Sequence, residues 1–238
     1  MSTLLLRLAG PLQAWGSENS RFAERQTRQE PTKSAVIGLI AAAQGRRRCD
    51  PVEDLLRLQF GVRIDQPGVV IRDFHTAHNA KGESMPLTNR YYLCDAIFIA
   101  GLSAGRGLLE GLADALTHPV FPLFLGRRSC VPSGKLVQGI VDEDLGAALR
   151  NHPWQAASWY QQKLRRQGRS VELELLRDRL SDEDQPDIVE TVRDLPLSFS
   201  PNRRDYGWRD VVHEERVRFD DAAPALLDHD PFSAFPGA

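Results

Sequence analysis

The sequence is poor in the features that mark extracellular, membrane and metal-binding proteins. It has three cysteines in 238 residues and no CxxC pair, which predicts free or buried thiols in a reducing compartment and no disulfide framework or zinc site. No apolar run approaches the roughly 18 residues that span a membrane. The short apolar run at the N-terminus lacks the charged segment that precedes it in a signal peptide. We therefore expect a cytoplasmic protein that makes no membrane contact.

Catalytic motifs are also missing. The sequence contains no HExxH, no paired Asp cluster and no Walker motif, so it predicts no metal site, no cofactor and no nucleotide hydrolysis. Metal-independent RNA cleavage needs only a histidine or tyrosine that takes a proton from the 2′-hydroxyl and a cation that stabilises the phosphorane. His75, His78, Lys81 and Tyr91 could supply these groups on a hairpin. Polar residues at a hairpin tip are more often contacts than catalysts, so we predict no catalytic residue and keep an endoribonuclease as the alternative.

Acidic residues are absent from three long stretches, although the formal net charge is only −2. A protein that binds nucleic acid by bulk charge alone would be more basic. Residues 31–49, 115–141 and 145–171 contain no Asp or Glu. They carry Lys33, Arg46 to Arg48, Arg127, Arg128, Lys135, Arg150, Lys163, Arg165, Arg166 and Arg169. Because segregation along the chain need not mean segregation in space, a basic face and an ordinary solvated surface fit this pattern equally.

The order of secondary-structure signals predicts an α+β fold. Strands are expected at 3–8, 57–64, 69–76, 91–102 and 135–141, and helices at 31–45 and 105–118. The strands 69–76 and 91–102 could pair as a hairpin with its tip at 77–90. This βαββαβ order is ferredoxin-like and RRM-like, a plan that many unrelated proteins share. We place this domain at 1–141, a smaller β-rich region at 142–219 with an acidic loop at 181–187, and a flexible tail at 220–238.

Two segments have the character of anion sites. Gly126 would let the backbone approach a phosphate closely, and Arg127 and Arg128 offer forked donors beside it. Thr32, Lys33 and Ser34 lie at a predicted helix start, where free N–H groups and the helix dipole attract phosphate. Gln13, Trp15, His75 and Tyr91 could stack on bases or bind their edges. Each has an ordinary structural explanation too: Trp15 as core, Thr32 as an N-cap, His75 as a strand residue. Cys130 is expected to be a packed thiol that anchors the loop.

Three segments together resemble the CasD family, the RAMP-superfamily subunits of type I-E CRISPR Cascade complexes. They are LRLAGPLQAWG (6–16), PTKSAVIGLIAAAQG (31–45) and LGRRSCVPSGKLVQG (125–139), with IRDFHT and YYLCDA between them. The resemblance covers residues 3–141 well and continues more loosely through RDLPLSFSPNRRDYGW (193–208). It implies a ferredoxin-like domain with a protruding β-hairpin thumb at about 73–91 and a smaller C-terminal β region.

The resemblance also implies a function. The protein would be a non-catalytic RNA-binding subunit that holds the 5′ handle of the crRNA and caps one end of the ribonucleoprotein complex, for guide-directed DNA recognition in antiviral defence. Its partners would be the backbone subunit, the large PAM-reading subunit and, through the complex, target DNA. Type I-C relatives cut precursor RNA, which keeps the endoribonuclease alternative open, and a scaffold without RNA contact is a third possibility. The implied RNA-binding residues are Gln13, Trp15, Thr32, Lys33, Ser34, His75, Arg90, Tyr91, Gly126, Arg127, Arg128 and Ser129.

Overall fold

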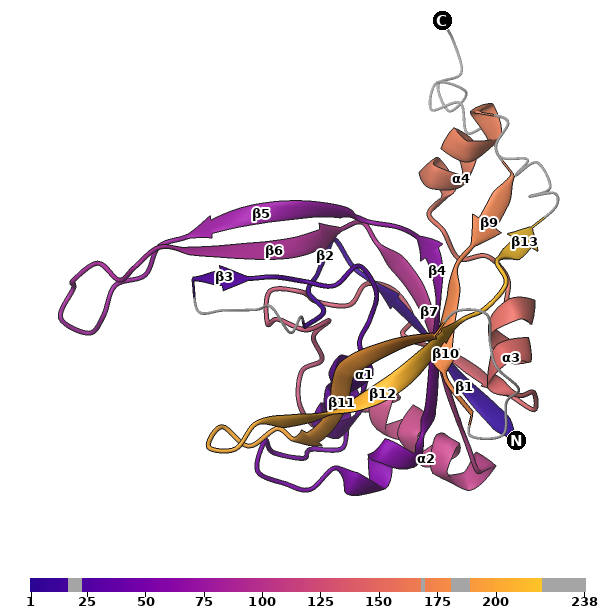
Figure 1. Cartoon of the computed structure of the whole chain (residues 1–238), viewed down its shortest axis with the longest axis horizontal. Coiled ribbons are helices and arrows are strands. Elements are labelled where there is room, and N and C mark those ends of the chain that lie inside the picture. The colour runs from indigo at the N-terminus through magenta and orange to yellow at the C-terminus, as the bar shows by residue number, and fades with distance from the viewer. Residues whose placement is uncertain (17–22, 168–169, 181–188, 220–238) are drawn as a thin grey trace, which may run out of the picture.

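The computed structural model describes residues 1–16, 23–167, 170–180 and 189–219, and the predicted acidic loop and tail lie outside them. A seven-stranded sheet organises the described residues, in the order β11-β12-β10-β4-β7-β1-β8 (Figure 1). Its strands are β1 (Ser2–Ala9), β4 (Gln59–Gln66), β7 (Ile97–Ala104), β8 (Val137–Val141), β10 (Leu175–Asp178), β11 (Val189–Ser198) and β12 (Asp205–His213). All neighbouring strands run antiparallel. The mixed α+β fold agrees with the prediction.

The central strands are apolar on both faces because helices cover both. Successive side chains of a strand point to opposite faces, so Leu4 and Leu6 of β1 pack in a core with α1 (Lys33–Ala43) and α2 (Arg106–Thr117). Leu5 points the other way, into a smaller core with α3 (Leu145–Asn151). Each fully buried leucine contributes about 1.5–3 kcal/mol. This two-sided burial explains why β1 reads as a continuous apolar run.

The single strand predicted at 91–102 is wrong, because the chain forms two strands there. β6 (Thr88–Cys94) and β7 are separated by Asp95 and Ala96. Asp95 has a positive φ of 56°, a left-handed conformation that aspartate tolerates better than most residues. The Gln66 amide donates to the Asp95 carbonyl at 2.6 Å and fixes the bend. The bend lets β6 leave the central sheet while β7 stays in it.

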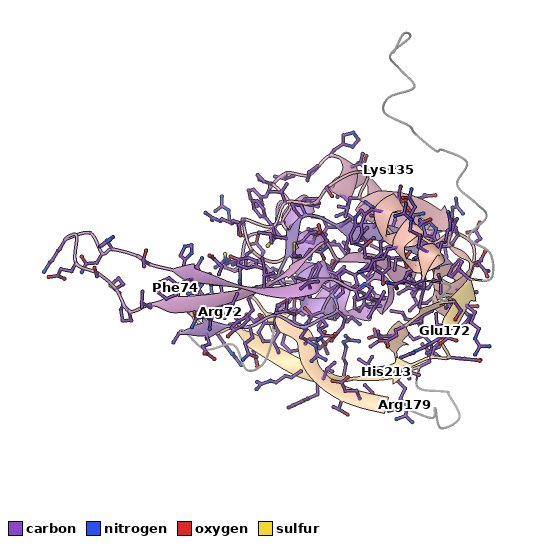
Figure 2. The ribbon with its side chains drawn as sticks, turned by 90° about the horizontal axis from the view of Figure 1, so that it is seen from above. Arg72, Phe74, Lys135, Glu172, Arg179 and His213 are labelled. Atoms are coloured by element: carbon purple, nitrogen blue, oxygen red, sulfur yellow. The ribbon has the colours of Figure 1, made fainter. Side chains whose placement is uncertain are left out.

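A hairpin of β5 (Val69–His75) and β6 projects from the central sheet (Figure 1). β5 pairs with β6 along its whole length, and β2 (Leu12–Gln13) and β3 (Glu24–Arg25) pair with the other edge of β6. Val69 and Phe74 of β5 are exposed, and Figure 2 shows Phe74 beside Arg72 on the projecting part. Exposed apolar residues on an unpaired edge strand indicate a surface suited to contact with other chains.

The C-terminal region adds strands to the same sheet. β10 pairs with β4, β12 pairs with β10, and β11 pairs with β12. The described residues also include the 3-10 helix at Glu53–Arg57, α4 (Ser158–Arg166) and a two-stranded pair of β9 (Val171–Leu173) with β13 (Val217–Phe219). The division into domains at residue 141 stays a prediction. Every helix in the described part of the chain is too short or too polar to cross a lipid bilayer.

A buried arginine ties the chain after α3 to β4. Arg63 is 0% exposed, and its Nε and Nη2 donate to Asp65 at 2.7 and 2.9 Å. Its Nη1 donates to the carbonyls of Leu149 and His152 at 2.6 and 2.5 Å, and Nη2 donates to that of Pro153 at 3.0 Å. A buried charge is stable only when paired and hydrogen-bonded throughout. The pattern therefore fixes the path of the chain at residues 149–153.

Candidate anion-binding groove

A groove of about 590 Å³ lies where five separate segments meet. They are residues 14–16, the segment around Arg25, α1 with the chain that follows it, the loop 121–128, and the turn between β11 and β12. Seven arginines line it: Arg25, Arg46, Arg47, Arg48, Arg127, Arg128 and Arg204. Among the described residues no Asp or Glu lines it, whereas Trp15, Phe121, Phe124, Phe199 and Tyr206 do. We call this the arginine groove. Cations and aromatic rings without acids are the composition expected of a site for single-stranded nucleic acid.

The groove brings together half of the residues implied by the sequence. Trp15, Thr32, Ser34, Gly126, Arg127 and Arg128 line it, although they are spread over more than 110 positions of the chain. The other six do not line it: Gln13, Lys33, His75, Arg90, Tyr91 and Ser129. Residues from three of the segments in the resemblance therefore meet at this groove, and the RNA-binding role of each stays a prediction.

Gly126 is required by a close backbone contact. Its φ is +94°, and a Cβ on it would stand 1.7 Å from the Ala14 carbonyl oxygen, so no side chain fits. The Ala14 N–H donates to the Leu125 carbonyl at 3.0 Å, and the Leu125 N–H donates to the Cys130 carbonyl at 2.7 Å. Cys130 is fully buried, as predicted, and burial raises the pKa of its thiol. The loop 125–130 is thus closed on itself and pressed against residue 14.

Arg127 points back into the protein. Its Nη1 donates to the Tyr91 carbonyl at 3.0 Å and its Nη2 to the Arg25 carbonyl at 2.7 Å. The guanidinium also lies over the Tyr92 ring, 4.6 Å from its centroid, a distance typical of a cation–π contact. Arg127 therefore joins the loop to β3 and β6, and only part of its surface faces the groove.

Arg128 is the exposed partner of this pair. It lines the arginine groove and, within the described chain, its side chain makes no hydrogen bond or ion pair. The same holds for Arg47, Arg48 and Arg204, which are also exposed. Arg46 differs, because both its Nη atoms bind Asp54 at 2.5 Å and lower the pKa of that carboxyl. No acid in the described ranges therefore occupies these four guanidinium groups, which leaves them able to bind an anion.

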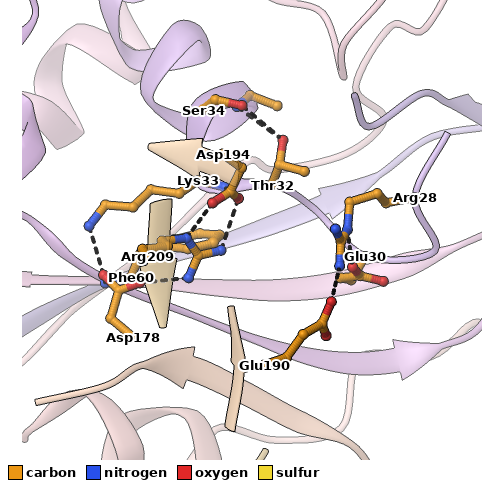
Figure 3. Close-up of polar contacts among 11 residues, drawn as sticks. Arg28, Glu30, Thr32, Lys33, Ser34, Phe60, Asp178, Glu190, Asp194 and Arg209 are labelled. Atoms are coloured by element: carbon orange, nitrogen blue, oxygen red, sulfur yellow. Dashed lines mark hydrogen bonds and ion pairs between the residues drawn. The ribbon is translucent and has the colours of Figure 1, made fainter. Parts of the chain in front are cut away.

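The start of α1 is already occupied by carboxylates of the chain (Figure 3). The Lys33 N–H donates to Asp194 at 2.8 Å, and its ammonium binds Asp178 at 2.7 Å. Arg209 bridges the same two carboxylates at 2.5 and 2.6 Å. Burial lowers the pKa of Arg209, but its hydrogen bonds to the two carboxylates outweigh burial and raise it overall. The two positive charges of Lys33 and Arg209 are balanced by the two aspartates, so the Lys33 ammonium is not available to bind a phosphate. Thr32 is the N-cap of α1 and accepts from the Ala35 N–H.

Trp15 and Gln13 belong to the interior. Trp15 is 2% exposed and meets Phe98 edge to face, with ring centroids 6.2 Å apart. Gln13 is buried and its amide donates to the Ala96 carbonyl at 2.6 Å. The aromatic groups open to the groove are others: Phe121 is 40% exposed, and Tyr206 is half-buried. Sequence reasoning missed these two, and the Arg203-Arg204 pair beside Tyr206 was the signal that could have found the turn.

The hairpin residues that could cleave RNA do not converge. In the β5–β6 register His75 lies opposite Thr88, and Tyr91 lies opposite Arg72. Because paired residues share a face and successive residues alternate, His75 and Tyr91 lie on opposite faces of the hairpin. His75 contacts Asp73 at 3.3 Å. The part of the chain that the structure describes contains no group of three or more His, Cys, Asp and Glu side chains able to hold a metal.

Comparisons with known proteins identify a family whose model spans every segment of the groove. The model of the CRISPR-associated protein family Cas5 matches residues 3–212. The CRISPR system Cascade subunit CasD of Escherichia coli (strain K12) is 36% identical over 174 residues, which are 63% of this chain and 77% of that protein. A chain in a solved CRISPR RNA-guided surveillance complex is similar with a TM-score of 0.71 and 32% identity, over 91% of both chains. A crystal structure of a Cas protein is similar with a TM-score of 0.67 and 37% identity, over 91% of this chain and 95% of that one.

Proposed function

Because the chain belongs to the Cas5 family of CRISPR-associated proteins, we propose that it is a crRNA-binding, non-catalytic subunit of a type I-E Cascade complex. The observation that carries this proposal is the arginine groove, with exposed and unpaired Arg47, Arg48, Arg128 and Arg204 and no described acidic residue in its lining. The similarity to the Cascade subunit CasD supports the same assignment.

The ligand of the groove is the 5′ handle of the crRNA. A single-stranded RNA exposes its base edges, so a protein can bind phosphates and splayed bases together. The four unpaired arginines bind phosphates, and Phe121 and Tyr206 contact bases. The volume of about 590 Å³ falls within the roughly 300–1,000 Å³ typical of pockets for small organic groups. Lys33 is a structural residue in this assignment, and the half-buried Ser34 is the donor at the start of α1 that lines the groove.

The fold supports a place at one end of the complex. The strand order β4-β7-β1-β8, with α1 and α2 as the connections on one face, supports a ferredoxin-like core. The projecting β5–β6 hairpin supports the role of a thumb against the backbone subunit, since Val69, Ile71 and Phe74 are exposed on it. The large PAM-reading subunit is the second protein partner in this proposal, and target DNA meets this chain only through the assembled complex.

A double substitution tests the groove. Arg128→Ala with Arg204→Ala removes two unpaired cations, and the matched control Arg57→Ala with Lys135→Ala removes two exposed cations outside the groove. Each protein is co-expressed with the other subunits, and the bound RNA is sequenced and its affinity measured against salt. We expect the groove variant to bind handle RNA about tenfold or more weakly, with a salt slope smaller by roughly 1.4 for two lost phosphate contacts. Equal retention of handle RNA by both variants would refute the assignment.

The endoribonuclease alternative receives no support from the geometry of the hairpin, because His75 and Tyr91 lie on opposite faces. We propose that the chain does not cut RNA. Incubation of the complex with repeat RNA in EDTA tests this. Specific cleavage that disappears in Tyr91→Phe or His75→Ala would overturn the proposal and favour the enzyme.

A further inference from the structure

A second basic and aromatic surface lies on α4, which takes no part in the groove. Trp159, Gln162, Lys163, Arg166 and Gln167 line a shallow hollow of about 370 Å³. α4 has no buried residue, and no residue of α4 lines the arginine groove. In Figure 1 α4 stands well away from the tip of the β5–β6 hairpin and from α1. We call these five residues the α4 patch.

Helix geometry places the useful groups of the patch in one row. Trp159, Lys163 and Arg166 are spaced i, i+4 and i+7, so they share one face of the helix. The Trp159 side chain is 53% exposed. The Trp159 and Tyr160 rings are nearly perpendicular, with centroids 5.6 Å apart and an interplanar angle of 84°. The Trp159 side chain is therefore held in place by Tyr160 while much of it remains open to a ligand.

Among the described residues, two cations of α4 lack the acidic partners that several other exposed arginines have. Arg106 binds Glu110 and Asp142, and Arg216 and Arg218 bind Glu172. Lys163 and Arg166 make no ion pair or hydrogen bond through their side chains within the described chain. Because α4 lies in the acid-free stretch 145–171, its own helix offers no carboxylate either.

Stabilisation of the helix dipole is an incomplete explanation of the patch. Cations in the last turn of a helix are favourable at about 0.3–1 kcal/mol each, and α4 has Lys163, Arg165 and Arg166 there. That effect does not account for a tryptophan exposed in the same row. Exposed aromatic rings between unpaired cations are the arrangement with which proteins hold single-stranded nucleic acid, since every base has a face that can stack.

We propose that the α4 patch is a second nucleic-acid-binding site for a single-stranded segment, separate from the arginine groove. Lys163 and Arg166 bind successive phosphates, and Trp159 stacks on a base. The same chemistry fits an RNA strand and a displaced DNA strand, so the test compares the two. The inference stands on α4 alone and does not depend on what occupies the groove.

The test uses the full chain carrying Arg128→Ala and Arg204→Ala, so that the groove does not mask binding elsewhere. Into this background are placed Lys163→Glu with Arg166→Glu, or Trp159→Ala, or Trp159→Phe. Arg57→Glu with Lys135→Glu is the control for net charge, because both are exposed residues outside the two sites. The probes are fluorescein-labelled 20-nucleotide oligo-dT and oligo-U, titrated at several salt concentrations.

We expect charge reversal to weaken binding of at least one probe tenfold or more and to reduce the salt slope by roughly 1.4. Trp159→Ala should weaken it about tenfold while Trp159→Phe stays close to its parent. The affected probe identifies RNA or DNA as the ligand. Unchanged affinity for both probes overturns the proposal, and so does an equal loss in the charge control. Unchanged affinity with loss of a subunit from the co-expressed complex would assign the patch to a protein partner.

Discussion

Arg127 and Arg128 are neighbours in sequence, but we expect their substitutions to have different effects. Arg127→Ala removes two good hydrogen bonds to backbone carbonyls, at 2.7 and 3.0 Å, and a cation–π contact with Tyr92. Hydrogen bonds of a charged group contribute about 1.5 kcal/mol at the low end of their range, and a partly exposed cation–π contact about 0.5 kcal/mol. The two hydrogen bonds and the cation–π contact together contribute about 3.5 kcal/mol. Arg128→Ala removes no described contact and should change stability by less than about 0.5 kcal/mol.

Thermal unfolding and RNA binding separate the two roles. In a protein of this size 1 kcal/mol shifts Tm by about 2–4 °C, so Arg127→Ala should unfold about 7–14 °C below the parent. Arg128→Ala should keep the parental Tm and lose handle RNA. Arg127→Lys should recover little stability, because a lysine ammonium does not reproduce the forked geometry.

One pattern of results would refute this reasoning. If Arg127→Ala unfolds at the parental temperature and yet binds less RNA, the guanidinium is a ligand contact and its carbonyl bonds stabilise nothing. Binding must be measured well below the lower Tm, so that unfolded protein does not imitate a lost contact.

Three further substitutions have expected outcomes. Gly126→Ala should lower the free energy of unfolding in urea by at least about 2 kcal/mol, from its left-handed backbone and the carbonyl against it; parental stability would show that the contact is loose. Asp194→Asn should lower the free energy of unfolding by about 3–5 kcal/mol, because Arg209 and the Lys33 N–H lose a buried charged partner. A decrease below about 1 kcal/mol in the same urea titration would contradict this. Burial lowers the pKa of His152, so its stability contribution is present above its unfolded pKa of about 6.5 and is lost as pH falls through the folded value. In His152→Gln the free energy of unfolding should therefore fall less steeply as the pH is lowered. A pH profile of stability identical to that of the parent would contradict the role of His152.

The parts of the fold that could be predicted are those that local patterns determine. The strand β1 was predictable from its run of apolar residues, and the helix between Thr32 and Gly45 was predictable from its capping residues. The structure places the cap at Thr32 and a positive φ of 78° at Gly45. The break at Asp95 was not predictable in this way, because one left-handed residue inside an apolar run changes the backbone and leaves the pattern of hydrophobicity intact.

The candidate site was predictable only by segment. The resemblance singled out the loops that form the groove, yet the role of each side chain depends on partners far away in sequence. Lys33 meets Asp178, 145 residues later, and Arg127 meets the Arg25 carbonyl, 102 residues earlier. No local pattern at residues 33 or 127 contains that information, so arginine and lysine at these positions look alike whether they bind a ligand or the protein itself.

A stretch of sequence without acidic residues indicates a binding surface only when acidic residues from other parts of the chain also stay away from it in the folded structure. Lys33 lies in the acid-free stretch 31–49 but is neutralised by a carboxylate from β10. Arg47 and Arg48 of the same stretch have no ion-pair partner among the residues that the structure describes, and they line the groove. An arginine already paired with a carboxylate must exchange that partner for a phosphate and gains little affinity, while an unpaired and exposed one releases only counterions and water. We therefore expect the binding surfaces of this chain to be marked by cations that no acid among the described residues pairs with, as at Arg128 in the arginine groove and Arg166 in the α4 patch.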